Sequence, residues 1–156
     1  MKISENLDMS EVIRSESAKR LGIRNMPSNE HINNLKELAE NIFEPIRRNF
    51  RVPIRISSGY RSPALNRAIG GSQTSQHSRG EALDIDMDGN PHGVTNKQIF
   101  DYIKNNLNFD QLIWEFGNNN NPDWVHVSYN TKGQQRKQVL VAKKINGKTT
   151  YTPYGK

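Results

Sequence analysis

The stretch SQHSRGEALDID, residues 75–86, determines how the rest of the chain is interpreted. From residue 81 to residue 87 apolar and polar residues alternate, which predicts a half-buried strand. The stretch DWVHVS, residues 123–128, alternates in the same way and predicts a second strand. Together the two stretches hold two histidines and several carboxylates, which favours a metal site on neighbouring strands.

Three residues of these stretches have the chemistry of zinc ligands. A hydrolytic zinc site uses three protein ligands and leaves one position open for water. His77 precedes the first strand, Asp84 lies within it and His126 lies on the second, so the three side chains can converge on one ion. Gly80 allows the backbone to turn between His77 and Asp84. A single strand histidine is more often a hydrogen-bonded structural residue than a ligand, and it is the joint pattern that favours the metal site.

Two further residues have the chemistry of catalytic groups. Asp123 lies three residues before His126, and a carboxylate near a metal can take a proton from water and return it to a leaving amine. Arg61 follows a predicted strand and a glycine turn, and a cation there can polarise a scissile carbonyl. Both also have ordinary interpretations, as a loop residue and an ion-pair partner. Glu115 has ligand chemistry too, but it falls on a separate predicted strand without a supporting motif.

These motifs, with SGYRS at residues 58–62, resemble the zinc D-Ala-D-Ala carboxypeptidase and L-alanyl-D-glutamate endopeptidase family. That family includes vancomycin-resistance dipeptidases and phage endolysins, and it shares a fold with the hedgehog signalling domain. The resemblance covers roughly residues 54–128, and residues 10–23 are similar to small phage members.

The resemblance implies a set of site residues. It places zinc on His77, Asp84 and His126 and makes Asp123 the general base. It makes Arg61 the carbonyl-polarising residue and gives Ser75 a hydrogen bond to the substrate peptide. The implied activity is hydrolysis of a peptide bond in peptidoglycan stem peptides, at an L-Ala-D-Glu or D-alanyl link, by a phage or prophage lysis enzyme. The alternative is a non-catalytic zinc-containing module of a phage virion, because a fold does not secure an activity.

The order of predicted elements indicates the fold class. Helices are predicted from Ser10 to Gly22, from Ser28 past Pro45 and from Thr95 to Leu107, with most strands following later. This order predicts one compact α+β domain, residues 1–156, with a largely antiparallel sheet packed with helices. Asn146-Gly147 predicts a C-terminal β-hairpin around residues 138–153. By resemblance the fold is hedgehog/D-Ala-D-Ala peptidase-like.

Composition restricts the partners. The chain has no cysteine, which excludes thiolate ligands. Its net charge is +6, but it has no long run of basic residues and no aromatic residues alternating with basic ones, as a nucleic-acid stacking surface would need. We therefore expect no nucleic-acid partner. No apolar run approaches about 20 residues, so we expect no stable membrane insertion. The N-terminus has no apolar signal region. We expect a monomer made in the cytoplasm that acts on the cell wall after release, with a holin-type partner for export.

Other motifs have less specific interpretations. Asp84, Asp86 and Asp88 with Gly89 imitate the start of a calcium loop, but the twelfth position is Thr95, where that loop needs glutamate. We expect His31 and His92 to be surface residues. Trp124 has two interpretations, as a residue that packs on the sheet or as one that contacts substrate.

Overall fold

The computed structural model describes residues 1–155. Its elements in chain order are β1 Lys2–Ser4, β2 Leu7–Asp8, α1 Met9–Ile13, α2 Glu16–Leu21, α3 Asn29–Leu38, the π-helical turn η1 Ala39–Phe43, α4 Glu44–Phe50, β3 Ile56–Ser58, α5 Pro63–Ala68, the 3₁₀ helix η2 Gln76–Arg79, β4 Ala82–Ile85, α6 Asn96–Asn106, β5 Gln111–Glu115, β6 Trp124–Ser128, β7 Gln138–Ile145 and β8 Lys148–Pro153.

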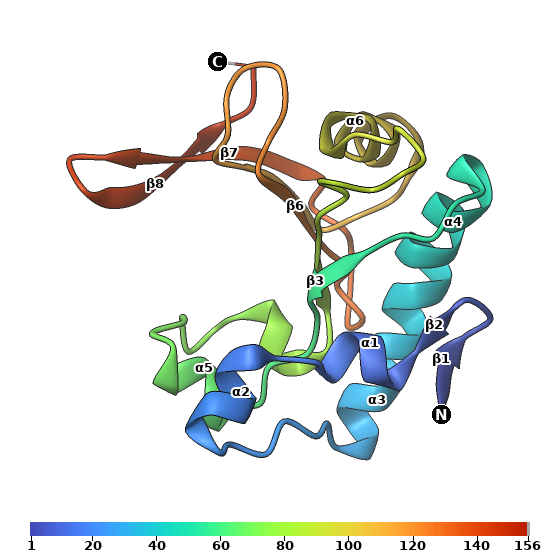
Figure 1. Cartoon of the computed structure of the whole chain (residues 1–156), viewed down its shortest axis with the longest axis vertical. Helices are drawn as coiled ribbons and strands as arrows, with labels where there is room; N and C mark the ends of the chain where they lie inside the picture. Colours follow the sequence, from blue (N-terminus) through green and yellow to red (C-terminus); the bar gives the residue numbers. More distant parts are fainter. Residues whose placement is uncertain (156) are drawn as a thin grey trace.

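A six-stranded sheet in the order β3-β4-β6-β5-β7-β8 forms the centre of the molecule. Neighbouring strands are antiparallel except β5 and β7, which are parallel. The helices lie mostly before the sheet in sequence, and they pack against it (Figure 1). The predicted α+β class with a largely antiparallel sheet is confirmed.

Strand alternation gives the sheet one apolar face and one polar face. The apolar face joins the hydrophobic core through residues of the four central strands, namely Leu83, Ile85, Leu112, Trp114, Val125, Val127, Val139 and Val141. On the opposite face, the register places Asp84 beside His126 and His126 beside Ile113. The two candidate ligands of the sheet therefore lie on adjacent strands and share a face.

The helix α6 covers the apolar face at β5 and β6. Thr95 caps it, and the predicted capping box with Gln98 is present. Ile99, Phe100 and Ile103 are fully buried. Burying side chains of this size stabilises the fold by about 1.5–3 kcal/mol each, so this face of α6 is a major contribution to the core.

The segments α3, η1 and α4 follow one another without a break. Pro45 falls in the first turn of α4, directly after the π-helical turn, where its ring and missing N–H interrupt the α-helical hydrogen-bond pattern. The π-helical turn directly precedes this point, and Ile42 and Ile46 on either side of it are fully buried. The change from π-helical to α-helical geometry therefore falls at the proline.

The predicted helix from Ser10 to Gly22 is wrong in detail. Asp8 caps α1 in a capping box with Glu11, and the chain leaves helical geometry at Arg14. Ser15 then caps α2 by accepting from the Ala18 N–H. A second cap in mid-segment competes with helix continuation, and two short helices result.

The β7–β8 hairpin extends from the sheet at the end of the molecule far from α1, α2 and α5 (Figure 1). Asn146 and Gly147 form its turn, both with positive φ, at 52° and 78°. This geometry is what an Asn-Gly two-residue hairpin turn requires. Within residues 1–155 there is no helix long and apolar enough to cross a membrane.

Candidate metal centre

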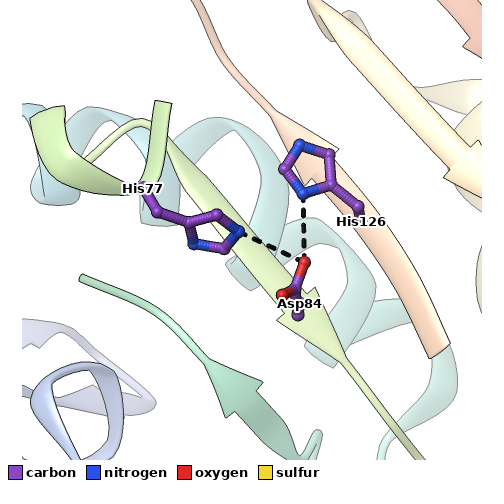
Figure 2. Close-up of side chains that lie close together, drawn as sticks. All are labelled: His77, Asp84 and His126. Carbon is purple, nitrogen blue, oxygen red and sulfur yellow. Dashed lines mark hydrogen bonds and ion pairs between the residues drawn. The ribbon is translucent and has the colours of Figure 1, made fainter. Parts of the chain in front are cut away.

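The side chains of His77, Asp84 and His126 converge at one point on the polar face of the sheet (Figure 2). The Asp84 Oδ1 atom lies 3.3 Å from His77 Nε2 and 3.0 Å from His126 Nδ1. One ligand atom from each residue lies within 4.8 Å of the others. Two imidazole nitrogens and a carboxylate oxygen in this arrangement are donors that suit a zinc ion.

A backbone contact determines which nitrogen of His77 is available. Its Nδ1 lies 2.7 Å from the Gly59 carbonyl oxygen, which can only accept a hydrogen bond. Nδ1 is therefore the protonated nitrogen, and the lone pair of Nε2 faces Asp84. Such a contact to the second nitrogen is the usual way in which proteins orient a metal-binding histidine.

The turn that carries His77 is held from both ends. The Ser75 hydroxyl accepts a hydrogen bond from the His77 N–H at 3.3 Å, and Gly80 ends the 3₁₀ helix with a φ of 74°. A Cβ atom at Gly80 would lie 2.5 Å from the His31 carbonyl oxygen, so this position requires glycine for space as well as for φ. The predicted role of Gly80 thus has a direct steric basis.

The electrostatics of Asp84 keep it ionised. Burial alone would raise the pKa of this carboxyl, but His77 and His126 outweigh it and hold the pKa well below its usual range. Asp84 is therefore a carboxylate, which is the form that can bind a cation.

A cavity of about 1300 Å³ opens above the three residues. Arg61 lines it, and the guanidinium Nε is buried without a hydrogen-bond partner among residues 1–155. Burial lowers the pKa of Arg61, and the negative charge of Asp84 opposes that shift. A buried donor without a partner is costly, so Arg61 is available to an acceptor that enters the cavity.

The cavity also contains a carboxyl group to which the sequence assigned no role. Glu115 lies on β5, two residues after Ile113, which pairs with His126. It therefore shares the polar face and is a diagonal neighbour of His126, at a spacing of about 7–8 Å between such positions. Its side chain lines the cavity and is only 6% exposed. Burial raises the pKa of Glu115 to about 7, an effect reinforced by Asp84 and opposed by His126.

Asp123 lies differently. It is exposed, it directly precedes β6, and it is absent from the residues that line the cavity. Its N–H donates to the Glu115 carbonyl oxygen at 2.9 Å, and its own carbonyl oxygen accepts from Asn96. The backbone of Asp123 thus helps to connect β5, β6 and α6, whereas the side chain of Glu115 lines the cavity together with the three candidate ligands.

The other predicted positions divide between cavity and surface. Ser75 and Trp124 both line the cavity, and the Trp124 ring lies 5.4 Å from that of Phe116. His31 is only partly exposed, lines the same cavity and lies 3.2 Å from the Tyr60 hydroxyl, so the expectation of a surface residue is wrong for it. His92 is exposed, as expected.

The acidic stretch after Asp84 forms a turn and not a calcium loop. In this turn the Asp86 carboxylate accepts hydrogen bonds from the Asn96 side chain and from the Asp88 N–H.

His77, Asp84 and His126 form a possible metal site, and the comparison with known families is consistent with a metallopeptidase. The chain matches the family described as Peptidase M15 over residues 5–128, most of its length. It belongs to the peptidase M15 family, a family of metallopeptidases. The resemblance inferred from the motifs is confirmed. A search of curated proteins finds no match.

Proposed function

We propose that this protein is a zinc-dependent peptidase that hydrolyses a peptide bond in bacterial peptidoglycan stem peptides, at an L-Ala-D-Glu or D-alanyl link. One observation carries the proposal. His77, Asp84 and His126 converge beneath a large cavity that is also lined by the half-buried Arg61 and the buried Glu115. Membership of the peptidase M15 family supports a peptide substrate of this class.

The donor set supports zinc as the metal. Two nitrogens and one oxygen, with no cysteine in the chain, match a catalytic site that keeps one position for water or substrate. When bound, zinc supplies Lewis-acid chemistry that polarises a carbonyl and lowers the pKa of water. The Gly59 carbonyl would then hold His77 in the binding orientation.

Glu115 is our candidate for the proton acceptor. It lies on the face that carries His126 and Asp84, lines the cavity and has a pKa raised to about 7 by burial. We infer that its carboxylate takes a proton from the attacking water as the new C–O bond forms. It returns that proton to the amine nitrogen as the C–N bond breaks. The motif-based candidate for the same role is Asp123, and the two assignments predict different mutants.

Arg61 and Ser75 are proposed to contact the substrate. The buried Nε of Arg61 lacks an acceptor among residues 1–155, which suits a scissile carbonyl oxygen that gains negative charge during attack. Ser75 lines the cavity while its oxygen accepts from the His77 N–H, so its hydroxyl proton is available to a substrate acceptor.

The biological setting is part of the proposal. We propose a monomeric phage or prophage lysis enzyme that reaches the wall with a holin-type partner. The second candidate is a non-catalytic virion module that retains the metal site. Under the motif-based assignment of Asp123 as the base, its exposed position favours this module, because the base would then lie outside the cavity. Cleavage of wall material distinguishes the two.

The test uses purified peptidoglycan and zinc-loaded protein, with soluble products identified by mass spectrometry. The proposal predicts peptide fragments whose new termini name the bond, and loss of those fragments with a chelator. Asp84→Ala serves as the metal-site control and should release none. Intact peptidoglycan from several wall types, at full zinc occupancy, would overturn the peptidase and favour the module.

A further inference from the structure

The β7–β8 hairpin lies outside the part of the chain that matches the peptidase family, residues 5–128. One face of the hairpin nevertheless lines the cavity above the metal centre. The residues that do so are Gln138 and Leu140 on β7 and Thr149 and Tyr151 on β8. The wall of the cavity on this side is therefore built by a segment that the family match does not include.

Strand register aligns Tyr151 with Glu115. Glu115 pairs with Ala142 on β7, and Ala142 pairs with Tyr151 on β8. Residues paired across neighbouring strands point to the same face, so Tyr151 and Glu115 share the polar face on either side of Ala142. Ala142 is small and fully buried, which leaves room for the larger side chains to lie over it.

The electrostatics agree with this placement. The pKa of Tyr151 is raised, first by burial and then by the negative charges of Glu115 and Asp84. Those charges act on the phenol because it lies toward the metal centre. The side chain is still 53% exposed, so a ligand in the cavity can reach it.

The Tyr151 hydroxyl makes no hydrogen bond to another residue within 1–155. Its ring is also absent from the aromatic contacts that hold Tyr154 against Phe100 and Trp114. Tyr151 thus has neither the packing nor the bonding of a structural tyrosine. A phenol of this kind offers one donor and a flat apolar surface at low entropic cost.

We propose that Tyr151 is a substrate-positioning residue: it contacts the peptide bound at the metal centre, and its hydroxyl donates to an acceptor oxygen of that peptide. The inference rests on the proposed peptidase function and assigns the β7–β8 hairpin as one wall of the peptide-binding cleft. Tyr151 contacts the part of the substrate on the β5 side of the metal, beyond Glu115.

The experiment compares Tyr151→Phe and Tyr151→Ala in steady-state hydrolysis of soluble muropeptides prepared from purified peptidoglycan. Tyr151→Phe should raise KM about fivefold with little change in kcat, because one hydrogen bond to the peptide is lost. Tyr151→Ala should raise KM further, by about tenfold or more, because the ring contact is lost as well. Both should bind zinc and unfold thermally like the wild type.

The matched control is Tyr154→Phe, which removes a hydroxyl from the same C-terminal segment on the core side, where the ring lies 4.9 Å from Phe100. It should leave KM and kcat unchanged. If wild type is active and both Tyr151 variants keep its KM, the positioning role is wrong while the peptidase stands. If wild type itself releases no product, the proposed function has failed and the inference fails with it.

Discussion

His77 donates its Nδ1 proton to the carbonyl oxygen of Gly59 across 2.7 Å, and so directs Nε2 toward Asp84. Gly59 belongs to the SGYRS stretch that also carries Arg61. One short segment therefore both orients His77 and supplies Arg61 to the cavity. We therefore expect the position of the Gly59 carbonyl to affect metal binding at this site.

Gly59→Ala should weaken both the fold and the metal site. A Cβ atom there would lie 2.6 Å from the Val12 carbonyl oxygen and 2.8 Å from its Cα, so the backbone must shift and carry the carbonyl with it. We expect a loss of about 1–3 kcal/mol in the free energy of unfolding. We also expect weaker zinc binding by calorimetry. Gly133→Ala is the control, since its nearest neighbour would be a side-chain nitrogen at 3.5 Å.

Asp84→Ala should abolish stoichiometric zinc binding, because it removes the carboxylate that both histidines face. Equilibrium dialysis with metal analysis measures the occupancy. Asp88→Asn, an exposed change in the following turn, should bind zinc like the wild type. Full occupancy in Asp84→Ala would contradict the assignment of the centre.

Glu115→Gln and Asp123→Asn separate the two candidates for the base. Glu115→Gln should retain zinc and lower kcat by about 10²–10⁴-fold, the usual contribution of a general base. Asp123→Asn should keep most of the activity, since the Asp123 side chain is exposed and away from the cavity lining. The reverse ranking would restore the motif-based assignment of Asp123.

The carboxyl of Glu115 should also make the metal-free protein less stable as pH rises. Burial raises the pKa of this carboxyl in the folded state from its ordinary value of 4.5 to about 7. Below pH 4.5 both states are protonated, and between the two values the unfolded state alone releases the proton. Above pH 7 the folded state therefore carries the full penalty, about 3 kcal/mol.

Glu115→Gln removes that penalty. Under a chelator, urea unfolding should find the variant more stable than wild type at pH 8, by up to about 3 kcal/mol, and equal to it near pH 4. A variant less stable than wild type at pH 8 would show that the charged carboxylate is well solvated or paired.

The main elements could be predicted because their signals are local. The capping box of Thr95 and Gln98, the Asn146-Gly147 turn and the alternation around Asp84 and His126 each depend on a few neighbouring residues. The motif spacing was enough to bring three ligands together, since two of them lie on strands whose polar faces must coincide.

Glu115 and Tyr151 could not be placed in this way. Their position in the cavity depends on which strands pair and in what register. β5 pairs in parallel with β7, although β6 lies between these two strands in the sequence. Nothing local to either residue encodes that pairing. The link between the short β1–β2 hairpin and α4 is also long-range, because the carboxylate of Glu44 accepts hydrogen bonds from Ser4 and Asn6.

Titration of the metal-free protein with zinc, read for both metal occupancy and release of peptide from purified peptidoglycan, tests the central claim most directly. We predict no release without metal and activity that rises in proportion to occupancy up to one zinc per chain. Asp84→Ala should neither bind nor cleave. Cleavage by the metal-free protein, or a fully zinc-loaded protein that releases nothing, would contradict the claim that this centre is a zinc peptidase.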